Sequence, residues 1–92
     1  MEINFEEDEK RDRGLIKEAL DKNATYADAA KWLTSHLIIR YGPEFGGVIG
    51  IEYDIISNKF TLKCGTGSRI FEEEELMDMP GHIQFLRKMK SK

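Results

Sequence analysis

The sequence predicts an α+β domain in which helices cover one face of a small antiparallel sheet. Apolar and polar residues alternate with a period of two over residues 48–64, with an interruption at Ser57-Asn58. Apolar residues recur at helical spacing over residues 26–41, and a second helical pattern follows residue 72. A strand pair with one apolar face needs a cover, and helices before and after it can supply that cover.

The alternation predicts a β-hairpin from Val48 to Cys64. The residues expected on its buried face are Ile49, Ile51, Tyr53, Ile55, Phe60, Leu62 and Cys64. Gly50 inside a strand pattern indicates a bulge or the close approach of another backbone. A third, short strand is expected over residues 69–71, after the turn at Gly65-Thr66-Gly67.

Two helices are expected before the hairpin, over residues 4–22 and 26–41. The first has an apolar stripe made of Leu15, Ile16, Ala19 and Leu20, whereas residues 6–13 are all charged. We therefore expect residues 1–13 to fray or to project from the domain. At the start of the second helix, Thr25 and Asp28 resemble a capping box. This helix is expected to end at Gly42-Pro43, because glycine tolerates a left-handed cap and proline cannot continue the helix.

The C-terminal part reads as helical from Glu72 to Lys90, with a break expected at Pro80-Gly81. Asp78 is expected to cap the later part of this segment, since proline suits the first turn of a helix. Its apolar residues recur every three positions, at Ile83, Leu86 and Met89.

The composition is that of one globular domain over residues 1–92, with 40% apolar and 34% charged residues. No apolar run reaches the ~20 residues of a membrane span, and the N-terminal residues lack the apolar core of a signal peptide. We expect a cytoplasmic protein. The net charge of -3 argues against direct binding of nucleic acid, for which a basic face is usual.

Few residues are candidates for chemistry. Gly65-Thr66-Gly67-Ser68 follows a strand, but it lacks the third glycine of a dinucleotide loop and the lysine of a Walker loop. We expect a plain turn there. His36 is expected to pack within its helix, His82 to lie in an exposed turn, and Cys64 to be a core thiol. We therefore expect no catalytic residue, no metal site and no cofactor.

The residues that we expect to meet a partner are Glu72, Glu73, Glu74, Glu75, Trp32 and Phe45. The acidic run is either a solvated helix start, where carboxylates favour the positive end of the helix dipole, or a patch for a basic partner. Trp32 and Phe45 belong to an aromatic and aliphatic group at the second helix that suits a core or an interface equally.

Residues 29–71 resemble the dynein light chain family. The resemblance rests on Ala29-Ala30 and the helix up to Tyr41, on the turn Gly42-Pro43-Glu44-Phe45, and on the strand start Val48-Ile49-Gly50. It implies a homodimeric adaptor that binds peptides at a sheet edge. The chain departs from the family between Ile55 and Phe60, where it lacks the residues of the swapped strand, so no binding residue is transferred.

These observations favour a non-enzymatic domain that binds another protein as a homodimer, with an extended peptide captured on a sheet edge. One alternative is a small inhibitor of the phage anti-defence type, whose acidic face blocks a nucleic-acid-handling protein. Another alternative is a small-ligand or nucleotide enzyme that uses the Gly65 turn.

Overall fold

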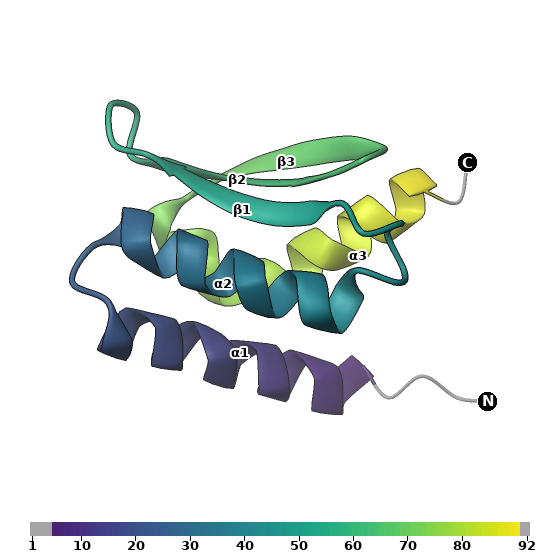
Figure 1. Cartoon of the computed structure of the whole chain (residues 1–92), viewed down its shortest axis with the longest axis horizontal. Helices are drawn as coiled ribbons and strands as arrows, with labels where there is room; N and C mark the ends of the chain where they lie inside the picture. The colour runs from purple at the N-terminus through teal and green to yellow at the C-terminus, as the bar shows by residue number, and fades with distance from the viewer. Residues whose placement is uncertain (1–4, 91–92) are drawn as a thin grey trace.

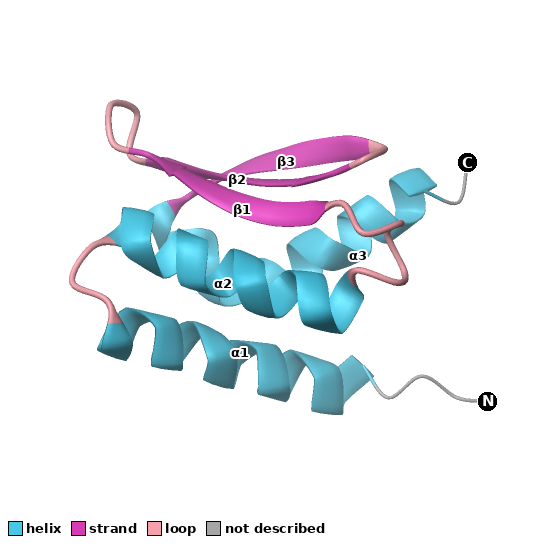
Figure 2. Cartoon of the chain, in the orientation of Figure 1, coloured by secondary structure: helices cyan, strands magenta, loops and turns pink. Residues whose placement is uncertain are grey.

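Figure 1 shows the computed structural model, in which a three-stranded sheet lies over two helices and a third helix packs on their far side. The structure describes residues 5–90, and side chains are described for residues 9–89. The elements are α1 (Phe5–Lys22), α2 (Tyr26–Tyr41), β1 (Ile49–Asp54), β2 (Lys59–Cys64), β3 (Gly67–Glu72), the 3-10 helix η1 (Glu73–Asp78) and α3 (Met79–Lys90). The predicted α+β class is confirmed (Figure 2).

The sheet is antiparallel throughout, in the order β1-β2-β3. Its register is regular, with Leu62 opposite Ile51 on one side and Arg69 on the other. The face toward the helices is apolar, and its buried residues are Ile49, Ile51, Phe60, Leu62 and Phe71. Alternation in the sequence therefore assigned the two faces correctly over most of the hairpin.

Ile55 is a correction to the predicted hairpin. β1 ends at Asp54, and Ile55 lies in the turn with 73% of its surface exposed. In this turn the Asp54 carboxylate accepts a hydrogen bond from the Ile56 N–H at 2.9 Å, and Asn58 has a left-handed φ of 59°. The turn ends the strand alternation one residue earlier than the pattern suggested.

The helix α2 has the predicted bounds, but the conformation of its C-cap differs from the expected one. Thr25 Oγ1 accepts a hydrogen bond from the Asp28 N–H at 3.2 Å, which is the predicted N-cap. Gly42 has a right-handed φ of -50°, so the expected left-handed cap is wrong at this position. The left-handed glycines are Gly46 and Gly47, with φ values of 66° and 83°. The chain continues to turn through residues 42–47 before it enters β1.

The core lies between the sheet and the helices. α2 supplies Ala29, Ala30, Leu33, Leu37 and Tyr41, and the C-terminal segment supplies Leu76, Met79, Ile83 and Leu86. α1 packs on α2, α3 and η1 through Ile16 and Ala19. The described residues contain no helix with the length and apolarity of a membrane span.

The charged half of α1 is anchored at Asp12. α1 is helical from Phe5, and Asp12 is only 1% exposed. The Tyr41 hydroxyl donates to Asp12 Oδ2 at 2.5 Å, and Arg40 Nε lies 3.1 Å from Asp12 Oδ1. The expectation that residues 1–13 project from the domain is therefore wrong at Asp12. Residues 1–4 lie outside the described residues.

The C-terminal segment divides at Asp78 rather than at Pro80-Gly81. Residues 73–78 form η1, and Asp78 directly precedes α3. Pro80 then falls in the first turn of α3, where its missing N–H leaves no hydrogen bond unmade.

Candidate protein-interaction surface

One edge of the sheet, at β1, is closed by a side chain of α2. Thr34 Oγ1 accepts a hydrogen bond from the Ile51 N–H at 3.0 Å and lies 2.9 Å from the Ile51 carbonyl oxygen. A Cβ added at the neighbouring Gly50 would lie 3.3 Å from Thr34 Cγ2, so glycine allows this close approach. The neighbour of Gly50 is therefore a side chain of α2, and the expected bulge or close backbone is wrong at this position. An incoming strand has no access to the Ile51 backbone.

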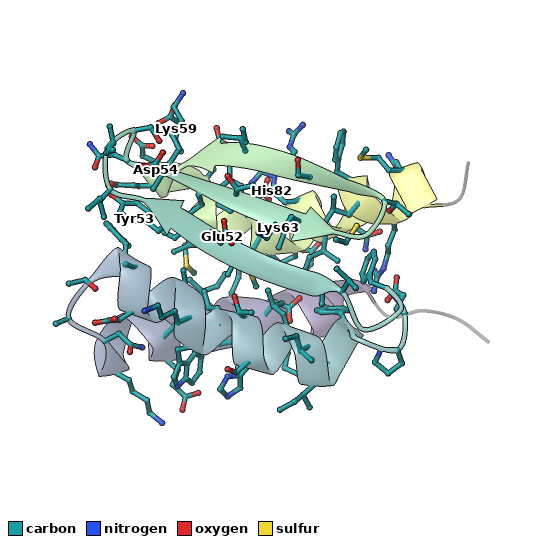
Figure 3. The ribbon with its side chains drawn as sticks, turned by 45° about the horizontal axis from the view of Figure 1, so that its top comes forward. Glu52, Tyr53, Asp54, Lys59, Lys63 and His82 are labelled. Carbon is teal, nitrogen blue, oxygen red and sulfur yellow. The ribbon has the colours of Figure 1, made fainter. Side chains whose placement is uncertain are left out.

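The opposite edge, at β3, is open. The N–H and C=O of Ile51 point to Thr34 and therefore away from β2. Leu62, which lies opposite Ile51 on β2, consequently directs its own N–H and C=O toward β3, where they form backbone hydrogen bonds with Arg69. Alternation along β3 then directs the backbone groups of Ser68, Ile70 and Glu72 away from the sheet. No described side chain closes them as Thr34 closes Ile51, and no further strand lies beyond β3 (Figure 3).

Apolar side chains flank this open edge on both sides of the sheet. Ile70 lies on the outer face and is 63% exposed. Phe85, on α3, lies on the helix side and is 38% exposed, with the Arg69 guanidinium 4.5 Å from its ring centre. A strand added at β3 would cover both groups, and this combination of unpaired backbone and apolar side chains is typical of a strand-accepting edge.

His82 contacts the Arg69 side chain from below the sheet. The burial of His82 is the largest difference between the structure and the sequence-based expectation. His82 was expected in an exposed turn, but it is 3% exposed and stacks on Phe71 with ring centres 4.1 Å apart. Arg69 Nε donates to His82 Nδ1 at 3.3 Å. The Pro-Gly-His sequence suggested a turn, whereas residues 79–90 form a helix whose apolar face includes this ring.

The environment of His82 favours the neutral ring. Burial lowers the pKa of His82, and the Arg69 guanidinium adds to this effect, whereas Asp78 and Glu75 oppose it. Because Nδ1 accepts from Arg69, the ring proton belongs on Nε2, which is buried without a hydrogen-bond partner among the described residues. The nearest carboxylate oxygen, on Glu75, is 3.8 Å away.

The outer face of the sheet carries interleaved charges. Lys63 pairs with Glu52 at 2.6 Å (Figure 3). Lys59 pairs with Glu72 at 3.6 Å. Exposed pairs of this kind stabilise a fold by at most about 1 kcal/mol. The face around Ile70 is thus polar and of mixed sign rather than acidic.

The predicted acidic run Glu72, Glu73, Glu74 and Glu75 ends β3 and begins η1. Glu73 accepts a hydrogen bond from the Tyr53 hydroxyl at 2.6 Å, and this bond raises the pKa of Tyr53 to about 12. Glu72 lies near the Lys59 ammonium group, and Glu75 lies near the His82 ring. Together with Glu73, three carboxylates of the acidic run therefore have a partner within the chain. Glu74 is exposed.

The two predicted aromatic sites lie away from the β3 edge. Trp32 is half-buried on α2 and stacks on His36, with ring centres 3.8 Å apart. Phe45 is only 7% exposed and belongs to the core. The structure therefore does not bring Trp32, Phe45 and the acidic run into one surface.

The Gly65 turn is a tight connection between β2 and β3. It leads into a strand, so it lacks the helix N-terminus that a phosphate loop uses. A pocket of about 110 Å³ lies beside it, next to Cys64 and Glu44, whereas small-molecule sites usually measure about 300–1,000 Å³. The described residues contain no group of three or more His, Cys, Asp or Glu side chains that could hold a metal ion.

The sequence and the structure were compared with known proteins. No family model, no curated protein and no solved structure matches the chain. The resemblance to dynein light chains stays a prediction.

Arg69, Ile70 and Phe85 were not predicted from the sequence as residues of an interaction surface. The signal for Ile70 was present, because alternation with Phe71 places an isoleucine on the outer face of a strand. It became informative only once β3 was known to be the last strand of the sheet.

Proposed function

We propose that this chain is a non-enzymatic protein-interaction domain that accepts an extended strand of another polypeptide at β3. The observation that carries the proposal is the difference between the two sheet edges, of which Thr34 closes one and nothing described closes the other. Main-chain hydrogen bonds to Ser68, Ile70 and Glu72 would supply affinity. Contacts with Ile70, Arg69 and Phe85 would supply selectivity.

Binding is favoured over catalysis by the separation of the reactive side chains. His36 stacks on Trp32, His82 stacks on Phe71, and Cys64 lies beside Thr66. A nucleophile and its base need to lie within hydrogen-bond reach of each other, and these three residues have different neighbours.

An acidic-faced inhibitor receives less support. The proposal would need free carboxylates on one surface, whereas Glu72 and Glu73 are engaged by Lys59 and Tyr53. On the outer face of the sheet, lysines such as Lys63 also lie between the acidic residues.

The test compares partner capture by three forms of the intact chain from the cells that produce it. Ile70→Pro removes an outward backbone donor, which an edge strand tolerates because that N–H makes no bond within the sheet. Ile70→Val is the matched control, since it keeps the donor. We expect the wild type and Ile70→Val to retain the same partner and Ile70→Pro to lose it. Equal retention by a folded Ile70→Pro variant would contradict the proposal.

A further inference from the structure

We infer that the strand accepted at β3 is β3 of a second copy of this chain, antiparallel and related by a two-fold axis at Ile70. The inference rests on the proposed function, because it names the partner of the same edge. It places this interface on the edge strand, where it includes Glu72 of the acidic run but neither Trp32 nor Phe45.

The backbone of β3 is complementary to itself in this arrangement. Its outward groups belong to Ser68, Ile70 and Glu72, at alternate positions spaced evenly around Ile70. A two-fold axis at Ile70 sets Ser68 opposite the partner's Glu72 and Ile70 opposite the partner's Ile70. Every outward N–H and C=O of the strand then meets a complementary group.

Neighbouring registers are worse. An axis at Arg69 would set two guanidinium groups directly opposite each other, and like charges in that position are destabilising. An axis at Phe71 would set Ile70 opposite the partner's Glu72 and would leave Ser68 without a cross-strand neighbour. The register at Ile70 overlaps as many strand residues as the register at Arg69, but it alone gives Ser68, Ile70 and Glu72 each an outward-facing partner, and it has no like-charged pair.

The side chains beside the edge fit the same register. On the outer face Ile70, which is 63% exposed, meets its copy in an apolar contact. On the helix side Arg69 faces the partner's Phe71, and the exposed ring of Phe85 lies below the junction. Both sides of the sheet gain apolar contact from one added strand.

A second copy closes the assembly, which a peptide or a third chain does not. The joined sheet has six strands in the order β1-β2-β3 and then the same strands reversed, because each copy contributes three. Both of its ends are β1 edges, and Thr34 closes each at Ile51. The pairing therefore covers both β3 edges and leaves at each end a β1 edge that Thr34 blocks at Ile51, so it stops at two chains. A 92-residue domain also gains stability from such an interface, because its own core is small.

Sedimentation equilibrium of the intact chain over a concentration series tests the inference. We expect a dimer whose dissociation constant rises by about tenfold or more in Ile70→Lys, since two lysines would face each other across the axis. Ile56→Lys is the matched control, because Ile56 is 91% exposed at the hairpin turn. Urea unfolding of each variant verifies that it is folded.

Cross-linking tests the register. In a Cys64→Ala background, Ile70→Cys should give a covalent dimer with a short bismaleimide, and Ile56→Cys should give little. A monomeric wild type, or a dimer that Ile70→Lys leaves intact, would overturn the inference. A monomer that still loses its cellular partner on Ile70→Pro would overturn the second copy and leave the proposed function standing. A monomer whose capture is unaffected by Ile70→Pro would remove both.

Discussion

Asp12 is a single buried carboxylate that joins α1 to the end of α2. Its two oxygens interact with the Tyr41 hydroxyl and with Arg40 Nε, which comes from the same turn of α2. Burial, and after it the hydrogen bond to the Asp12 carboxylate, raises the pKa of Tyr41 to about 12. The Tyr41 hydroxyl therefore keeps its proton and donates to Asp12 at neutral pH.

Replacing Tyr41 by Phe should remove this donor and leave Asp12 with unmet hydrogen-bonding capacity. A hydrogen bond to a buried charged group contributes about 1.5–3 kcal/mol, so the free energy of unfolding in urea should fall by that amount. Tyr26→Phe is the control, because Tyr26 is 37% exposed, and it should cost little. Equal losses in the two variants would mean that the Asp12 bond does not stabilise the fold.

Neither Asp12 nor His82 could be identified as buried from the sequence. Asp12 lies within a run of charged residues, and His82 follows Pro-Gly, so the local pattern of each indicates exposure. Both are buried by contacts with distant parts of the chain, Tyr41 for one and Phe71 for the other. Local periodicity reports only the average environment of a segment and therefore cannot find such pairs.

At the scale of elements, α2 is the main cover of the sheet. Leu33 is 0% exposed, and Leu37 and Tyr41 continue its buried face along the helix. Leu33→Ala should lower the free energy of unfolding by about 2–5 kcal/mol, since it removes buried methyl groups and leaves a cavity.

Ile39→Ala on the same helix is the matched control for Leu33→Ala. Ile39 is 79% exposed, so its substitution should cost under about 0.5 kcal/mol. A loss below about 1 kcal/mol for Leu33→Ala would mean that α2 does not act as the cover.

The helices and strands were largely predictable from the sequence, whereas the open edge of the sheet at β3 was not. Alternation predicted the hairpin and its buried face because one side of each strand meets the core. It could not state that β3 is an edge or that Thr34 reaches Ile51, since both depend on the order of strands and on where α2 lies across them. The candidate site therefore had to come from the structure.

We predict that His82 makes the stability of the whole molecule depend on pH. Burial lowers its pKa, so between that lowered pKa and about 6.5 the unfolded chain binds a proton that the folded chain does not. Stability therefore rises with pH across this window and falls as the pH drops below about 6.5, by at most about 1.4 kcal/mol per pH unit.

Urea unfolding at a series of pH values between about 7 and 5 measures this dependence. His82→Phe keeps an aromatic ring against Phe71 and should flatten the profile in that window, whereas His36→Gln should retain the wild-type slope. The charged groups that face His82 are Arg69 on β3 and Glu75 and Asp78 on η1. A wild-type slope in His82→Phe would assign the dependence to another group.

We propose that β3 presents an open edge that accepts a strand. Amide hydrogen exchange in the intact chain tests it residue by residue, because the N–H groups of Arg69 and Phe71 face β2 whereas those of Ser68 and Ile70 face outward. We predict slow exchange at Arg69 and Phe71 at every protein concentration, and exchange at Ser68 and Ile70 that slows as concentration rises and two chains pair. Fast exchange at Ser68 and Ile70 at every concentration, with bound partner as well as without, would contradict the proposal that β3 accepts a strand.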